Sequence, residues 1–182
     1  EMCHQMACEP GADIDHSHVD HSLELLRNLM CVQQSAEVCH GLRYGNPSFE
    51  NCHQMSNLAI DFMSLALEQA RKAYDLDEVP VGSIIVKNGE VISASFNQVI
   101  SQNLVTSHAE INAIQIASKK LNNYRLVNCD IYVTLEPCHM CAKAIVDARL
   151  KNLFFGALEP KTGAIVSIDR FLDASHLNHR VN

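Results

Sequence analysis

The residues that decide the fold are 81–96, VGSIIVKNGEVISASF, which predict two strands and the turn between them. An apolar run from Val81 to Val86 predicts a short buried strand, and Val91 to Phe96 predicts the strand that returns beside it. The intervening Asn88-Gly89 pair is typical of a two-residue hairpin turn, because both of its positions require positive φ. The sheet is therefore expected to begin with an antiparallel hairpin.

Helix and strand patterns alternate on both sides of this hairpin. Apolar residues at helical spacing predict helices at 58–74, 108–121 and 139–149. A run of alternating apolar residues predicts a strand at 130–135, and a last strand at 151–155 is expected to end at Gly156. The order α-β-β-α-β-α-β places the chain in the α/β class, with a mixed sheet covered by helices.

The composition indicates a globular chain. Of its 182 residues, 47% are hydrophobic and 19% are charged, and one domain with an appendage is expected for this length. No apolar run approaches the roughly 18 residues of a membrane helix, and no basic-then-apolar segment opens the sequence. Eight cysteines without a secretory signal indicate free thiols or metal ligands. We therefore expect a cytoplasmic protein.

The formal charge of −7 is concentrated in one part of the chain. Residues 1–54 contain eight acidic and two basic side chains, whereas residues 55–182 contain 13 acidic and 12 basic ones. The first part also contains five of the eight cysteines and six of the ten histidines. We therefore divide the chain near Met55 into an appendage of unknown role, residues 1–54, and a functional domain, residues 55–182. Because that domain is almost neutral, the acidic total does not exclude a nucleic-acid partner.

The appendage has few recognisable features. Only residues 21–32 have apolar residues close to helical spacing. His16, His18 and His21 could bind a metal, but they lack a recognised ligand spacing, and a solvated polar segment is the preferred interpretation.

Three residues that commonly bind metal lie at the starts of two predicted helices. His108 begins one helix, and Cys138 and Cys141 begin the next, directly after Pro137, a residue suited to the first turn of a helix. The positive end of a helix dipole favours the thiolate form of such cysteines. One histidine and two thiolates fill three corners of a zinc tetrahedron and leave the fourth open for water, as in catalytic sites.

Glu110 lies two residues after His108, where a regular helix would direct the two side chains apart. The pair can therefore act together only if His108 precedes the regular helix. Glu110 could then lie beside zinc-bound water without binding the metal. Zinc lowers the pKa of such water to about 7, and a nearby carboxylate can take its proton and pass it to a ring nitrogen or a leaving amine.

Each half of this arrangement is ambiguous when taken alone. The Cys138-x-x-Cys141 pair could be half of a structural zinc site, a redox pair or two core thiols. Cys129 fits a core position at the start of a strand, and His139 and Met140 are interpreted as spacers near the rim of a pocket. Together with the His-Ala-Glu triplet, the cysteine pair completes the H-x-E…P-C-x-x-C signature of zinc nucleobase deaminases.

Further segments match one particular family. They are Glu78–Gly82, Ser107–Glu110, Asn123–Leu126, Tyr132–Cys138, Pro160–Ala164 and Asn178–Val181. On these segments, residues from about 58 to 181 resemble the bacterial tRNA-specific adenosine deaminases, which convert the wobble adenosine of a tRNA anticodon to inosine.

The resemblance implies a cytidine deaminase-like α/β/α three-layer fold with a mixed central sheet, commonly in a homodimer. It implies a hydrolase that acts on the amidine C–N bond of adenosine in the tRNA anticodon loop. One zinc ion per chain would be bound by His108, Cys138 and Cys141, and Glu110 would be the catalytic proton shuttle. Asn97 would contact the substrate nucleotide.

The sequence departs from the family pattern in three places. Residues 93–96, Ser-Ala-Ser-Phe, stand where the family usually has glycines and often an aromatic residue before the asparagine. Glu159 replaces the usual aspartate in a loop thought to approach the substrate backbone, and is taken as a second substrate-binding residue. Family members continue beyond the position of Asn182 into a last helix that helps to hold RNA, and we expect this chain to lack that helix.

Two other functions stay open at this stage. A zinc deaminase of free bases or nucleosides, of the guanine or cytosine type, would need no basic rim for RNA. An inert zinc-bearing partner subunit or RNA-binding module would not need a carboxylate at Glu110. Eight residues could form a basic rim, although ordinary solvated charges explain each of them equally well. They are Lys119, Lys120, Arg125, Lys143, Arg149, Lys151, Lys161 and Arg180.

Overall fold

The structure, a computed structural model, describes residues 49–182, with side chains described from Phe62 onward. The helical pattern at 21–32 and the candidate ligands His16, His18 and His21 lie outside the described residues.

Helices and strands follow the order that the sequence predicts, with a short 3-10 helix added near the end. The elements are α2 (Phe49–Tyr74), β1 (Gly82–Lys87), β2 (Glu90–Phe96), α3 (Ala109–Lys120), β3 (Cys129–Leu135), α4 (His139–Asp147), β4 (Asn152–Ala157) and η1 (Phe171–Asp173). The first of these helices begins nine residues before the predicted start at 58 and runs through Met55, where the composition changes.

The four strands form one mixed sheet in the order β2-β1-β3-β4. Strand β1 pairs antiparallel with β2 and with β3, whereas β3 and β4 are parallel and are connected through α4. Parallel neighbours need such a crossover, which is why a helix separates these two strands in the sequence. The mixed sheet expected from the element order is confirmed.

The hairpin that opens the sheet has the predicted turn. Lys87 pairs with Glu90 across it, and the two central residues have the positive φ that this turn requires, 52° at Asn88 and 82° at Gly89. The Asn-Gly pair therefore determines where β1 ends and β2 begins.

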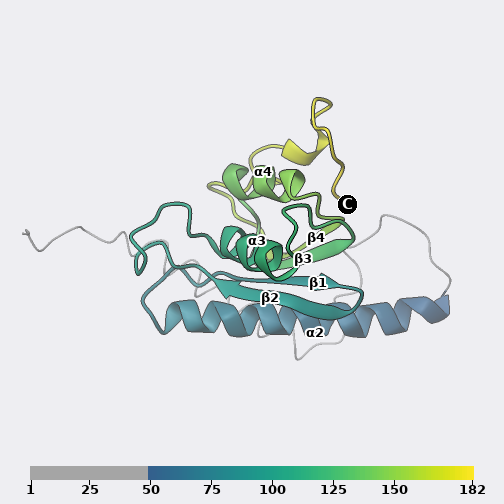
Figure 1. Cartoon of the computed structure of the whole chain (residues 1–182), viewed down its shortest axis with the longest axis horizontal. Helices are drawn as coiled ribbons and strands as arrows, with labels where there is room; N and C mark the ends of the chain where they lie inside the picture. The colour runs from purple at the N-terminus through teal and green to yellow at the C-terminus, as the bar shows by residue number, and fades with distance from the viewer. Residues whose placement is uncertain (1–48) are drawn as a thin grey trace, which may run out of the picture.

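Helices cover both faces of the sheet, and the three layers can be followed in Figure 1. On one face, Phe62 and Ala66 of α2 pack against Ile84, Val86 and Tyr132. The opposite face packs against α3 and α4 through a larger cluster. Its buried members include Ile85, Ala113, Ala117, Ile131 and Ile145. Because successive residues of a strand point to opposite faces, strands buried on both sides are apolar throughout.

Two further predicted boundaries are wrong. Strand β4 passes through Gly156 instead of ending there, because Ala157 still pairs with Leu135 of the parallel neighbour. Helix α4 ends at Asp147, two residues early, since Arg149 has a left-handed φ of 62° and cannot continue a helix.

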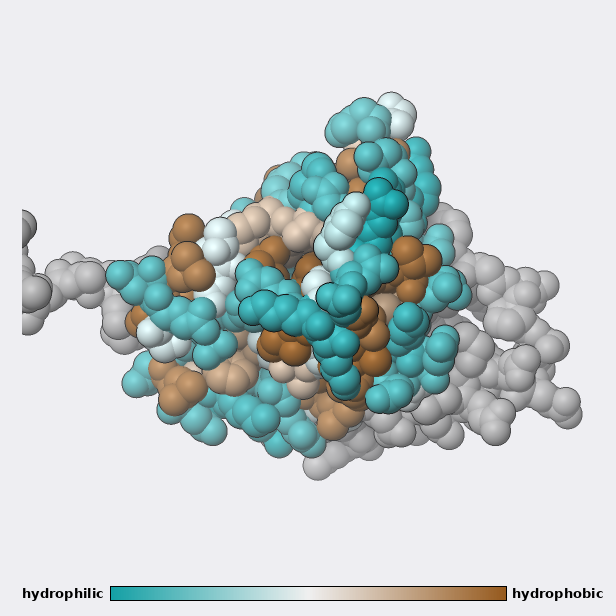
Figure 2. Space-filling model, in the orientation of Figure 1, coloured by the Kyte–Doolittle hydropathy of each residue, from teal (hydrophilic) through white to brown (hydrophobic). Residues whose placement is uncertain are grey.

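The surface contains polar and apolar residues side by side. Figure 2 shows several separate hydrophobic patches between hydrophilic side chains on one face. None of the helices within residues 49–182 has both the length and the apolar character needed to cross a membrane.

Candidate active site

His108 lies directly before α3, at a point where the backbone is still extended. It is the N-cap residue, with φ −67° and ψ 153°, and Glu110 follows in the first turn of the helix. This is the geometry expected from the sequence, because His108 must precede the regular helix if its side chain and that of Glu110 are to act together. Glu110 is buried, with 4% of its surface exposed.

The second helix start brings the two cysteines to the same place. Cys138 is the extended N-cap of α4, and Cys141 lies buried in its first turn. His108 Nδ1 is 3.8 Å from Cys138 Sγ and 3.5 Å from Cys141 Sγ. Pro137 precedes the cap instead of occupying the first turn, so the role predicted for it is wrong. Its carbonyl accepts a hydrogen bond from Ala164 N at 2.9 Å.

The three side chains fit a single zinc ion. Their ligand atoms all lie within 4.8 Å of one another. Tetrahedral zinc with Zn–S of about 2.3 Å and Zn–N of about 2.0–2.1 Å places nitrogen and sulfur ligands about 3.6 Å apart, close to the two distances measured from His108. The donor set of one imidazole and two thiols is also the set that zinc prefers.

The pKa values of the three candidate ligands are shifted by their contacts with one another. A hydrogen bond from the Cys141 thiol is the main cause that lowers the pKa of Cys138 to about 3. The same contact, together with burial, raises the pKa of Cys141, and the contact with Cys138 raises the pKa of His108. The lowered pKa favours the thiolate form of Cys138, the form in which cysteine binds zinc.

Glu110 does not belong to the group of potential metal ligands among the described residues. Burial raises the pKa of its carboxyl group, while the charge of His108 and a hydrogen bond with Cys141 act in the opposite direction. A buried carboxyl with a raised pKa, placed against the ligands but outside their group, is a candidate for proton transfer.

The sequence interpretation missed Glu136, which lies between β3 and the cysteine segment. Its Oε1 accepts hydrogen bonds from the backbone N–H groups of Ile165, Val166 and Ser167 at 2.7–3.0 Å. Its Oε2 accepts one from Glu159 N at 3.1 Å and another from the Ser167 hydroxyl. Burial opposes ionisation, but hydrogen bonds from the Ser167 hydroxyl and from the N–H groups of Val166, Ser167 and Glu159 outweigh it and lower the pKa of Glu136 to about 2.

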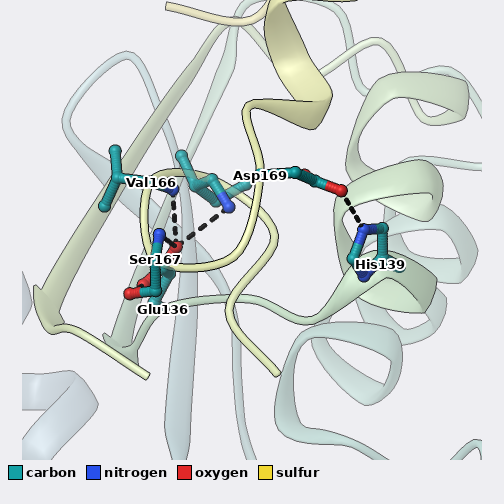
Figure 3. Close-up of polar contacts among 6 residues, drawn as sticks. Glu136, His139, Val166, Ser167 and Asp169 are labelled. Carbon is teal, nitrogen blue, oxygen red and sulfur yellow. Dashed lines mark hydrogen bonds and ion pairs between the residues drawn. The ribbon is translucent and has the colours of Figure 1, made fainter. Parts of the chain in front are cut away.

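These bonds attach the 158–169 loop to the segment that carries the cysteines, as Figure 3 shows for Val166 and Ser167. A β-bridge joins Cys138 to Gly163. A side chain at Gly163 could not fit, because its Cβ would lie 2.5 Å from the Glu136 carboxyl. Glu159, a predicted substrate-binding residue, belongs to this loop, and its own carboxyl accepts a hydrogen bond from Lys161 N at 2.9 Å.

His139, predicted to be a spacer, forms the other attachment of this loop. Its Nε2 lies 2.5 Å from an Asp169 carboxylate oxygen, and Figure 3 shows the aspartate directed from the loop towards α4. The ring also meets Phe171 edge-on, at 6.1 Å between centroids. His139 is therefore engaged away from the three candidate ligands.

Asn97 follows β2 and is 6% exposed. Its Nδ2 donates a hydrogen bond to Glu78 Oε2 at 3.0 Å. The Asn112 amide of α3 donates to two carbonyl oxygens, that of Phe96 at 3.1 Å and that of Ser107 at 3.2 Å. One side chain thus holds the residue before Asn97 beside the residue before His108. The predicted roles of Asn97, Glu159, Glu110 and the ligands stay predictions.

The expected basic rim is only partly available to a partner. Lys143 pairs with Asp147 at 2.5 Å. Arg149 donates to Asn178 O at 2.5 Å, and Arg180 donates to two backbone carbonyls, so both hold the C-terminal segment in place. Within residues 62–182, the other exposed basic residues of this set form no ion pair with a carboxylate. They include Lys119, Lys120, Arg125, Lys151 and Lys161.

Comparison with known proteins places this arrangement in one class. A family model described as MafB19-like deaminase matches residues 57–182. The tRNA-specific adenosine deaminase of Aquifex aeolicus (strain VF5) is 48% identical over 120 residues, which cover 66% of this chain and 80% of that protein.

Solved structures agree with the sequence relatives. One from a study of A-to-I editing by tRNA:A34 deaminases at the wobble position of transfer RNA is 46% identical, with a TM-score of 0.65, and the match covers 68% of this chain and 91% of that chain. The guanine deaminase of Bacillus subtilis is 38% identical, with a TM-score of 0.53, over 54% of this chain and 63% of that chain.

A three-layer fold with a His-Cys-Cys group and a buried glutamate at two helix starts defines an enzyme of the deaminase class. The chain belongs to the MafB19-like deaminase family, and its curated relatives carry the name tRNA-specific adenosine deaminase. The resemblance and the α/β/α fold class predicted from the sequence are therefore confirmed.

Proposed function

We propose that this chain catalyses the zinc-dependent hydrolytic deamination of adenosine to inosine at the wobble position of a tRNA anticodon. The observation that carries the proposal is the convergence of His108, Cys138 and Cys141 beside buried Glu110. This group occurs in a chain that is 48% identical to a protein named tRNA-specific adenosine deaminase.

His108, Cys138 and Cys141 would hold one zinc ion through Nδ1 and the two Sγ atoms. When bound there, zinc supplies a Lewis acid that makes water ionise near neutral pH. The two cysteines occupy the start of α4, where the helix dipole also favours their thiolate forms.

Glu110 then moves the protons of the reaction. Water attacks C6 of adenine, so a C–O bond forms and the bond to the exocyclic nitrogen breaks, giving inosine and ammonia. Glu110 takes one proton from the attacking water and passes it to the ring nitrogen, and then takes the second from the new hydroxyl group and passes it to the departing nitrogen. Its burial keeps this exchange away from bulk solvent. Asn97 would contact the nucleotide, and Glu159 would help to place the substrate backbone through its loop.

A second candidate is a deaminase of free bases, which the likeness to the guanine deaminase of Bacillus subtilis favours. The two functions differ in the state of the substrate, because a base within an anticodon loop must be turned out of its stack to reach the site. The test is to incubate the zinc-loaded protein with an anticodon stem-loop that has a single wobble adenosine. Inosine at that position supports the proposal, whereas deamination of free guanine without action on the RNA refutes it.

We also propose a homodimer in the cytoplasm, where tRNA substrates are found. Large apolar side chains exposed on the described surface could contribute to a subunit interface. They include Leu76, Ile100, Leu104, Val105, Ile116, Val127, Leu158, Val166 and Ile168. Sedimentation equilibrium at micromolar concentration tests this, and a monomer mass would refute the dimer.

A further inference from the structure

Glu78 is a buried acidic residue that the proposed chemistry does not use. It lies between α2 and β1 and is 1% exposed. Burial of a carboxyl group is unfavourable unless its oxygens find hydrogen-bond donors. Glu78 has three of them, the Asn97 side chain at 3.0 Å, Ile100 N at 3.1 Å and Ser101 N at 2.6 Å.

These bonds hold the start of the segment that leads from β2 to His108. Asn97 N is also bound, to Val81 O at 3.0 Å, and Gln98 N donates to Ser107 O at 3.0 Å. At the other end, the Ser107 hydroxyl lies 2.9 Å from Gln102 Oε1. The segment is therefore fixed at both ends.

The bond from Glu78 also determines which way the Asn97 amide points. An amide has a donor end and an acceptor end of almost the same shape, so only its partners decide its orientation. Because Nδ2 donates to the Glu78 carboxyl, Oδ1 is directed away from it. No hydrogen bond reaches Oδ1 from within residues 62–182, yet Oδ1 is not among the fully buried unsatisfied atoms of that part of the chain. Within this part of the chain, Oδ1 therefore keeps an unused acceptor position.

We infer that Glu78 is a positioning residue for substrate binding, which orients the Asn97 amide so that Oδ1 meets a hydrogen-bond donor of the nucleotide. This inference rests on the proposed function, because it takes Asn97 to be in contact with the substrate. Glu78 itself does not touch the reacting atoms and acts only through Asn97.

A double-mutant cycle tests this dependence, because two residues that act as a unit give non-additive effects. The variants are Glu78→Ala, Asn97→Ala and the double variant, each assayed in zinc-loaded form on the anticodon stem-loop for kcat and KM. We expect Glu78→Ala to raise KM about tenfold, the equivalent of about 1.4 kcal/mol of lost binding. In the Asn97→Ala background the same change should alter KM less than twofold.

Two controls separate positioning from general disorder of the segment. Gln102→Ala loosens the same segment at the bond to Ser107 without touching Asn97, and its KM should stay within twofold of the parent. Zinc content and thermal unfolding are measured for every variant. If Glu78→Ala does not fold, Glu78→Gln replaces it, since the isosteric amide cannot accept hydrogen bonds at both ends.

Independent effects that multiply in the double variant would overturn the inference, and so would an unchanged KM in Asn97→Ala. A KM increase in Gln102→Ala as large as that in Glu78→Ala would also overturn it, because order of the segment would then explain binding. Absence of inosine with the parent protein is a different result, since it refutes the proposed function itself.

Discussion

Replacement of Glu136 by glutamine should lower the free energy of unfolding at neutral pH. This difference between variant and parent should shrink in acid. The carboxyl accepts five hydrogen bonds from the loop between β4 and η1. The glutamine side chain keeps the shape but turns an NH₂ group towards some of these donors, and it has no charge.

The size of the effect follows from the pKa of Glu136, which the loop N–H groups and the Ser167 hydroxyl lower from 4.5 to about 2 against the opposing effect of burial. This difference corresponds to about 3 kcal/mol of folding free energy. Because the folded-state pKa lies below the unfolded-state value, the stabilisation is complete above pH 4.5 and is lost as the pH falls towards 2. Linkage gives a loss of about 2 kcal/mol between pH 6 and pH 3.

Urea unfolding followed by far-UV circular dichroism measures the difference, with parent and variant at equal metal content at pH 6, 4.5 and 3. We expect the gap between the two proteins to be about 3 kcal/mol at pH 6 and about 1 kcal/mol at pH 3. Glu68→Gln, at an exposed position of α2, is the control and should leave stability unchanged. A gap that is small at pH 6, or that does not shrink in acid, would refute the assigned role of the carboxylate.

Three further outcomes are expected. Glu110→Ala should abolish deamination while zinc content, measured by atomic absorption, stays at one ion per chain; normal turnover would contradict the shuttle role. Chelation of zinc should stop turnover, and added zinc should restore it in the parent but not in Cys138→Ser. Burial raises the pKa of Tyr132 to about 12 from 10.0, so ionisation is less favourable in the folded state and stability falls as the pH rises above 10. Between pH 9 and 11, the free energy of unfolding measured in urea should fall by about 1 kcal/mol less in Tyr132→Phe than in the parent.

The features predicted correctly from the sequence depend on neighbouring residues. The Asn88-Gly89 turn follows from the φ angles that these two residues tolerate. The extended backbone at His108 follows from the requirement that Glu110, two residues later, faces the same place. In both cases the geometry is specified within about three residues, so the pattern is visible in the sequence.

The features that were missed depend on distant partners. Glu136 meets Ser167 across 31 positions, and Glu78 meets Ser101 across 23. The partners are mostly backbone N–H groups, which every residue except proline has, so no residue type marks them. Gly156 was misjudged for a related reason, because the strand continues only through pairing of Ala157 with Leu135.

The two buried acids show how an active site on loops can be precise. His108 and the cysteines lie at helix starts, whereas Asn97 and Glu159 lie beyond the ends of strands β2 and β4. Residues on loops are less ordered than those on helices and strands unless other groups hold them. A carboxylate between two segments can accept several N–H groups at once, and such charged bonds are stronger than neutral ones. Glu78 and Glu136 each do this, so the positions of Asn97 and of the loop that carries Glu159 depend on buried carboxylates.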